Sequence, residues 1–187
     1  MNKISTYIHA LLVGLLLVSC ANRGQGPQGG PRDTIPPVVV KENPLNGTLN
    51  FLGKEVIVQF DEYIQLDDVQ KNVLISPPQQ VPPEVKAIGK KLSVVFMEDL
   101  IDSTTYTIDF GAAICDYNEK VPLEGYVFAF STGDMIDSLS ISGRVYDAAT
   151  LNPMSSVLVG VHRNQEDSAL STLPFTRITR TDADGNF

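Results

Sequence analysis

The sequence contains no tryptophan and only two cysteines, Cys20 and Cys115. Cys20 directly follows an apolar run near the start of the chain, which leaves Cys115 without a partner for an intramolecular disulfide. Stability must therefore come from packing, and we interpret Cys115 as a small buried apolar residue. The missing tryptophan also leaves only tyrosine and phenylalanine to supply the ring surfaces on which sugars stack.

Histidine is also scarce, because His162 is the only one beyond the first twenty residues. Enzymes of the Ser-His-Asp and Cys-His kinds need an imidazole close to the nucleophile. His162 lies next to Val161 on a predicted strand, on the parity opposite to the valines expected to be buried, so we expect it to point to solvent. It cannot build a usual zinc site with Cys115 alone. We therefore predict no enzyme, no cofactor and no metal.

Basic residues are outnumbered, with 14 Lys and Arg against 22 Asp and Glu, for a formal net charge of −8. Such a balance makes a phosphate-neutralising surface improbable, so we expect no nucleic-acid partner. Acidic pairs at Asp61-Glu62, Asp67-Asp68 and Glu98-Asp99 are interpreted as solvated charges at strand ends and loops, with calcium at one end of a sandwich as the alternative. Asp182-x-Asp184-Gly185 predicts a turn, because Arg180 stands where an EF-hand loop needs an acid.

The N-terminus has a positive start at Lys3 and an apolar run over residues 10–18 that is too short to span a bilayer permanently. The sequence Leu17-Val18-Ser19-Cys20 resembles the lipobox of bacterial lipoproteins. The resemblance implies that residues 1–19 are a cleaved signal peptide and that Cys20 carries acyl chains, which together anchor a protein firmly. Residues 20–35, rich in Gly, Pro and Gln, would then form a lipidated flexible tether.

From residue 36 the dominant pattern is period-two alternation in short runs separated by turn residues, which predicts strands with one buried face. The clearest runs place apolar residues on one parity over 56–60, 92–96, 106–110 and 126–130. Weaker runs over 38–41, 73–75 and 84–88 bring the expected number of strands to about seven, as in an immunoglobulin (Ig)-like sandwich. The best place for a short helix is Asp67 to Lys71.

Several motifs of this region resemble those of the bacterial Ig-like domains known from S-layer proteins. They are the opening Pro36-Pro37, the turn from Asn43-Pro44 to Asn46-Gly47, the strand end Val58-Gln59-Phe60-Asp61-Glu62, Thr105-Tyr106-Thr107-Ile108 and the closing Phe130-Ser131-Thr132-Gly133. The resemblance implies an all-β, Ig-like β-sandwich over residues 36–133, of a kind that follows the lipid anchor in Bacteroidota-type lipoproteins. It brings no catalytic residues. Cys115-Asp116-Tyr117-Asn118-Glu119 departs from the pattern of the family in the shape of one loop.

A second module is expected over residues 138–187, after a short hinge at 133–137. Strands are predicted over Ile141 to Val145, Val157 to Val161 and Phe175 to Thr181. The motifs Ile-Ser-Gly-Arg-Val at 141–145 and Thr-Asp-Ala-Asp-Gly-Asn-Phe at 181–187 resemble the carboxypeptidase-regulatory-like fold, a small transthyretin-like sandwich. Three strands cannot close such a sandwich, so we expect this domain to be incomplete and the chain to be a fragment.

Four hydroxyl groups follow an aspartate in the manner of the O-glycosylation acceptors of Bacteroidota envelope proteins. They belong to Thr34, Ser103, Ser138 and Ser168. Their predicted positions in tether, turn and hinge would leave them accessible. The alternative, that Asp and Ser are simply common in turns, has equal weight.

These observations favour a non-catalytic lipoprotein of the cell envelope that acts as a structural spacer or as a protein-interaction module. Its expected partners are the outer membrane, through the lipid anchor, and other envelope proteins. The residues after Cys20 lack the acidic cluster of surface-exported lipoproteins, so a periplasm-facing location is the default, with surface exposure left open. The alternative function is an accessory glycan-binding lipoprotein of a polysaccharide-uptake system, which would require an exposed platform of Tyr or Phe.

Overall fold

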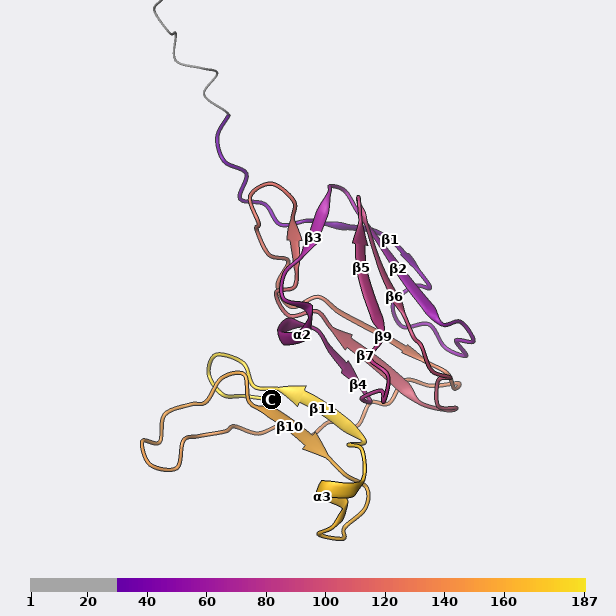
Figure 1. Ribbon diagram of the computed structural model, residues 1–187, viewed down its shortest axis with the longest axis vertical. Coiled ribbons are helices and arrows are strands. Elements are labelled where there is room, and N and C mark those ends of the chain that lie inside the picture. Colours follow the sequence, from indigo (N-terminus) through magenta and orange to yellow (C-terminus); the bar gives the residue numbers. More distant parts are fainter. Residues whose placement is uncertain (1–29) are drawn as a thin grey trace, which may run out of the picture. The chain divides into compact units, whose positions relative to one another are not determined.

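The computed structural model describes residues 30–187, and its strands are antiparallel throughout (Figure 1). The first sheet has four strands in the order β1-β2-β6-β5. Their bounds are Val39–Asn43 for β1, Glu55–Phe60 for β2, Lys91–Val95 for β6 and Glu84–Ile88 for β5. Because β2 and β6 pair with Val56 opposite Val94 and Val58 opposite Leu92, the apolar positions of both runs share one face.

The second sheet has three strands in the order β4-β7-β9. They span Leu74–Ser76, Thr105–Asp109 and Val127–Ser131. In this sheet Tyr106 lies opposite Phe130 and Ile108 lies opposite Phe128, and all four are fully buried. The alternation predicted for these runs is therefore confirmed, and the protein is all-β as expected.

The core between the two sheets is built around aromatic rings. Phe130 lies at its centre, with ring centroids 4.7 Å from Phe51, 5.7 Å from Phe96, 5.3 Å from Tyr106 and 6.4 Å from Phe128. Both the edge-to-face and the stacked geometries seen here are favourable beyond the area they bury. This cluster ties the loop before β2, the end of β6 and the strands β7 and β9 into one unit.

Two short strands form a small separate sheet that the sequence did not predict. They are β3, Ile64–Leu66, and β8, Ile114–Asp116, so the described part of the first module has nine strands, β1 to β9, where about seven were expected. Cys115, which we placed in a loop, lies within β8 and is 5% exposed, so its predicted burial is confirmed. Helix α2, Val69–Asn72, falls where a helix was expected and is capped by the side chain of Asp68.

The turn after β1 is fixed by a network of side-chain hydrogen bonds. Asn46 donates to the carbonyl oxygen of Val127 and accepts from the N–H of Ala129, which joins the turn to β9. The hydroxyl of Tyr126 donates to Glu42 at 2.8 Å. Burial and then this bond raise the pKa of Tyr126 well above its usual range. The Asn43-Pro44 and Asn46-Gly47 pairs thus mark a turn that follows β1 and is hydrogen-bonded to β9.

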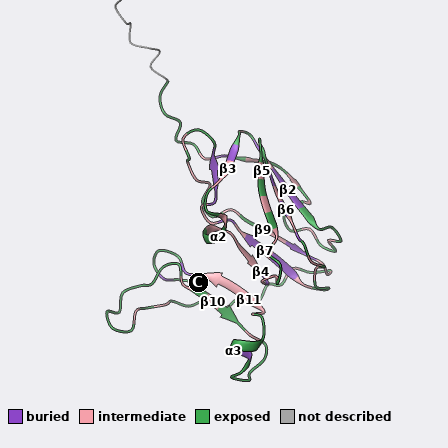
Figure 2. Cartoon of the chain, viewed as in Figure 1, coloured by how far each residue is buried: buried purple, intermediate pink, exposed green. Residues whose placement is uncertain are grey.

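The C-terminal segment contains a hairpin of β10, Leu158–Val161, and β11, Arg177–Arg180, and a short helix α3, Ala169–Thr172. The strand predicted over residues 141–145 is wrong in form, since it is joined to residues 185–187 by one isolated bridge, Arg144 with Asn186, and three backbone hydrogen bonds and forms no regular strand. Its side chains are little covered, because Ile141 is 71% exposed and only Val145 of this segment is half-buried. The C-terminal segment is less buried than the first module, as Figure 2 shows for β10, which is largely exposed, and β7, which is largely buried.

The predicted turn at Asp182 is confirmed. Its carboxylate oxygen Oδ1 accepts from the N–H groups of Asp184 and Asn186, and Gly185 has a φ of +78°. A Cβ at Gly185 would lie 2.7 Å from a backbone carbonyl oxygen, so glycine is needed for both conformation and space.

Candidate functional site

Cys115 lies in β8 and His162 directly after β10, and no hydrogen bond joins these two candidates for a catalytic pair. Burial raises the pKa of the Cys115 thiol, which disfavours the thiolate that a nucleophile needs. His162 does not point to solvent as predicted: its Nε2 atom is buried without a hydrogen-bond partner, and its ring lies 4.5 Å from that of Phe175. The parity rule failed here because β10 ends at Val161, so alternation does not extend to His162.

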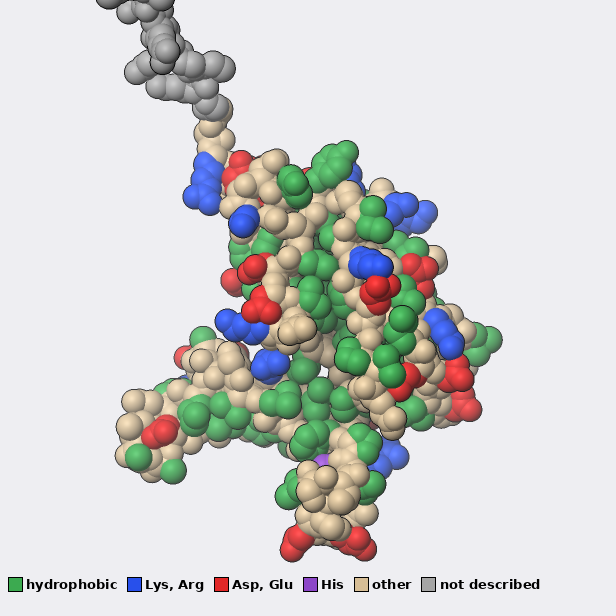
Figure 3. Space-filling model, viewed as in Figure 1, with side chains coloured by type: hydrophobic (Ala, Val, Ile, Leu, Met, Phe, Trp, Pro, Cys, Tyr) green, Lys and Arg blue, Asp and Glu red, His purple; other side chains and the backbone are tan. Residues whose placement is uncertain are grey.

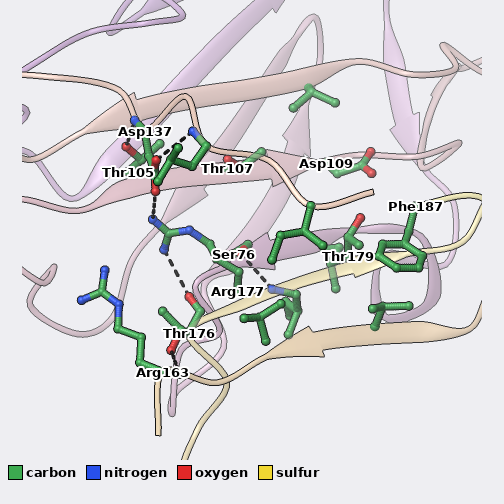
Figure 4. A pocket seen from close by; sticks show the side chains of 17 residues that line it. Ser76, Thr105, Thr107, Asp109, Asp137, Arg163, Thr176, Arg177, Thr179 and Phe187 are labelled. Atoms are coloured by element: carbon green, nitrogen blue, oxygen red, sulfur yellow. Dashed lines mark hydrogen bonds and ion pairs between the residues drawn. The ribbon is translucent and has the colours of Figure 1, made fainter. Parts of the chain in front are cut away.

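A groove of about 550 Å³ lies between the outer face of the sheet β4-β7-β9 and the β10–β11 hairpin (Figure 4). The sheet contributes Thr105 and Thr107, whose parity is opposite to that of the core residues Tyr106 and Ile108. Apolar side chains form much of the wall, namely Leu74, Val127, Leu139, Ile141, Val159, Val161, Ile178 and Phe187. Figure 3 shows hydrophobic side chains gathered on the surface of the same region.

A few polar contacts cross the groove and join the hairpin to the first module. Arg177 lies 3.7 Å from Asp137, and the N–H of Asp137 donates to the hydroxyl of Thr105. On β11, the N–H of Ile178 donates to the hydroxyl of Ser76. Since both partners of the ion pair are partly exposed, it contributes little to stability by itself. Sequence reasoning missed Ser76, Asp137 and Arg177, because only the folded chain brings them together.

Apolar and hydroxyl-bearing side chains make up most of the lining of the groove. None of its lining residues is a cysteine, a histidine or a lysine. Its carboxylates are Asp137, paired with Arg177, and Asp109, which accepts from the N–H of Gly111 at 2.9 Å. In Figure 4, Arg163 stands at one end of the groove and Phe187 at the other.

The four predicted glycosylation acceptors are not brought together. Thr34, Ser103, Ser138 and Ser168 lie in separate connecting segments, and each is exposed. Ser103 has a positive φ of 49°, as expected for a residue at the tip of a turn. Cys20 and the signal peptide lie outside the described residues.

At least one member of each acidic pair accepts a hydrogen bond or forms an ion pair, and Asp68 accepts from the N–H of Lys71. Asp61 accepts from the N–H of Val38, and Glu98 accepts from the N–H groups of Gln80 and Val81. Lys54 lies 2.6 Å from Asp99 and lowers the pKa of that carboxyl. Among residues 30–187, no group of three or more His, Cys, Asp or Glu side chains is placed to hold a metal ion. In the same range, no helix has the length and apolar character needed to cross a membrane.

Two antiparallel sheets packed around a common core define a β-sandwich, and residues 33–132 match the family model of the bacterial Ig-like domain. The chain therefore belongs to the bacterial Ig-like domain family, as its motifs suggested. No curated protein matches the sequence.

Solved structures that are similar to the chain include an L,D-transpeptidase from Mycobacterium smegmatis, with 11% identity, a TM-score of 0.36, and coverage of 79% of this chain and 77% of that one. The N-terminal part of the bacterial S-layer protein SbsC is similar at 17% identity and a TM-score of 0.34, over 81% of this chain and 32% of that one. The S-layer protein rSbsC(31-844) is similar at 15% identity and a TM-score of 0.33, over 81% and 18%. The chain thus spans a third or less of each S-layer structure.

Proposed function

We propose that this chain is a non-catalytic lipoprotein of the cell envelope, held at the outer membrane by acyl chains on Cys20 and facing the periplasm. In this proposal the Ig-like domain acts as a spacer or as a protein-interaction module. Membership of the bacterial Ig-like family supports it, since such domains occur in cell-envelope proteins. The lipobox-like Leu17-Val18-Ser19-Cys20 carries the anchoring part of the proposal.

The anchor is tested by feeding cells an alkyne-labelled fatty acid and following the label on the purified full chain. The label should be present on the wild-type protein and absent from a Cys20→Ser variant. Cys115→Ser is the matched control, because this thiol is buried in β8 and should leave labelling unchanged. A wild-type protein without label, or a label that survives in Cys20→Ser, would refute the anchor.

The choice between spacer and interaction module is tested by a photoreactive amino acid placed at exposed positions in cells. Leu139, which lines the groove and is 91% exposed, is the test position, and Leu52, 94% exposed and outside the lining of the groove, is the control. Discrete protein crosslinks at Leu139 alone would favour an interaction module. Absence of crosslinks at both positions would favour a spacer.

We further propose that residues 138–187 belong to a carboxypeptidase-regulatory-like module. The β10–β11 hairpin and the hydrogen bonds that join Gly143 to Phe187 and Val145 to Gly185 support this assignment. Hydrogen exchange on the full chain tests it. The amides of Gly143, Val145 and Phe187 should exchange more slowly than that of Leu139, and equal rapid exchange at all four would count against the module.

Thr34, Ser103, Ser138 and Ser168 are proposed as O-glycosylation acceptors, and their exposure supports the accessibility that the modification needs. Intact mass spectrometry of protein purified from a Bacteroidota host tests this. Replacing each hydroxyl residue by alanine should remove one glycan mass. An unmodified mass in the native host would show that these positions are ordinary turn residues.

A further inference from the structure

Two exposed tyrosines occupy opposed backbone positions at one end of the small sheet β3–β8. Tyr63 is 62% and Tyr117 is 63% exposed, and each lies one residue beyond the paired part of its strand. The N–H of Tyr117 donates to the carbonyl oxygen of Tyr63 at 2.9 Å, which continues the antiparallel register past Ile64 and Asp116. Directly opposed residues of this kind have Cα atoms about 5.5 Å apart and side chains on the same face.

The ring of Tyr63 is held against the turn between β5 and β6. A Cβ at Gly89 would lie 3.7 Å from the Cε1 atom of this ring, an ordinary van der Waals distance, so the ring lies beside this turn. The ammonium group of Lys90 lies 5.7 Å from the ring centroid and donates to the carbonyl oxygen of Asp61. The lysine therefore supports the ring, and the high exposure of Tyr63 shows that much of the ring stays open to solvent.

The backbone that carries Tyr117 is fixed just as firmly. The buried carboxylate of Asp116 accepts from the N–H groups of Asn118, Glu119 and Val121 at 2.8, 2.7 and 2.6 Å. On the neighbouring strand, the amide of Gln65 donates to the carbonyl oxygen of Asp116. Both tyrosines are thus exposed side chains on an ordered backbone, a combination that lowers the entropy lost on binding.

We propose that Tyr63 and Tyr117 form a binding platform for a neutral polysaccharide. The C–H groups on the face of a pyranose ring pack well on an aromatic face, and phenol hydroxyls can donate to and accept from sugar hydroxyls. Two opposed rings can hold neighbouring sugar units of an extended chain. A neutral ligand fits because the chain has a net charge of −8 and the acids Asp61 and Glu62 directly precede Tyr63.

The same surroundings disfavour an anionic lipid surface, which the negative charge of the chain would repel. The platform does not depend on the anchor or on the spacer function proposed above. Loss of the fatty-acid label from the protein would leave the platform untouched, and failure of the platform would leave the anchor untouched. The two proposals can therefore fail separately.

Affinity electrophoresis of the purified full chain tests the platform, in native gels containing a soluble β-glucan, xylan, galactomannan or pullulan. We expect retardation by at least one of these polymers, weakened about fivefold or more in Tyr63→Ala and in Tyr117→Ala. Tyr146→Ala is the matched control. Tyr146 is 47% exposed and has the guanidinium of Arg144 5.4 Å from its ring centroid, but it has no exposed tyrosine opposite it.

Tyr117→Trp gives a second measurement, because the chain has no tryptophan and the new indole would be the sole source of its fluorescence band. This variant should bind at least as tightly as wild type, with an emission shift when the retarding polysaccharide is added. Circular dichroism checks that every variant is folded. Retardation by none of the polymers, equal retardation of the Tyr63→Ala, Tyr117→Ala double variant, or binding only to phosphatidylcholine vesicles would each overturn the proposal.

Discussion

Asp116 offers the sharpest test of how side-chain chemistry stabilises this sandwich. It is 2% exposed, and its carboxylate accepts three backbone hydrogen bonds from residues 118, 119 and 121. Burial opposes ionisation, but these donors outweigh it and lower the pKa of Asp116. Replacement by alanine would leave three N–H groups to find other acceptors.

The expected cost follows from those bonds. A hydrogen bond to a charged group contributes about 1.5–3 kcal/mol, but the loop N–H groups can turn partly to water, so we expect Asp116→Ala to lower the free energy of unfolding by about 2–4 kcal/mol. Such a loss corresponds to a fall in Tm of about 10 °C. Asp116→Asn, which keeps one carbonyl acceptor and removes the charge, should cost about half as much.

The stabilisation by Asp116 should depend on pH in a definite direction. Because the pKa of Asp116 is lower in the folded state than its usual value of about 3.9, its contribution is complete above that pH and is lost as pH falls through the folded-state pKa. The stability gap between wild type and Asp116→Asn should therefore be constant from about pH 7 to pH 5 and should shrink below about pH 4. Urea unfolding followed by circular dichroism measures the gap.

Other carboxyls do not disturb this comparison. Asp99, Asp147 and Asp182 also have lowered pKa values because of hydrogen-bond donors beside them, but they occur in both proteins and cancel in the difference. A gap that stays constant down to pH 2, or a difference in Tm of less than 2 °C between wild type and Asp116→Ala, would show that the loop is held by other contacts.

Three further changes have equally definite outcomes. Phe130→Ala should cost about 3–5 kcal/mol because the ring lies at the centre of the core, whereas Leu52→Ala, at a position 94% exposed, should change urea stability by less than about 0.5 kcal/mol. Tyr126→Phe removes the bond to Glu42 and should cost about 1–2 kcal/mol at pH 7, with a smaller cost above about pH 10, where the unfolded tyrosine ionises; equal costs at both pH values would contradict this. Gly185→Ala should speed hydrogen exchange at residues 182–187, since φ is +78° and a Cβ would meet a carbonyl oxygen; unchanged exchange would refute the strain.

The sheets of the first module were predictable because their strands are long and have one buried face. Val56, Val58 and Phe60 share one parity over the six positions of β2, with Glu55, Ile57 and Gln59 on the other, and all three are buried as predicted. Strands β3 and β8 were missed because each has only three residues and includes a polar one, Gln65 or Asp116, whereas the equally short β4 was predicted from the continuous apolar run Val73-Leu74-Ile75. They exist because they pair with each other, a long-range contact that no local window contains.

In the C-terminal segment the alternation of apolar residues predicted a strand that did not form. Ile141, Gly143 and Val145 have the expected alternation, but a strand requires a partner over its whole length, and here residues 185–187 supply only three backbone hydrogen bonds and one isolated bridge. The same lack of cover leaves Val161, which was expected to be buried, 38% exposed. Alternation therefore predicts which face could be buried, and only a packed second layer decides whether it is.

The tyrosine platform depends on information of the same long-range kind. In the sequence Tyr63 follows an acidic pair and Tyr117 follows Asp116, and nothing local indicates that they meet. They become neighbours because Ile64 pairs with Asp116, and a slip of one residue would turn one ring to the other face of the sheet. The register of β3 and β8 is held by the buried side chains of Ile64 and Asp116. The residues that fold this sheet therefore also set the two exposed tyrosines at opposed positions, and a change at Asp116 that loosens the register should weaken polysaccharide binding together with stability.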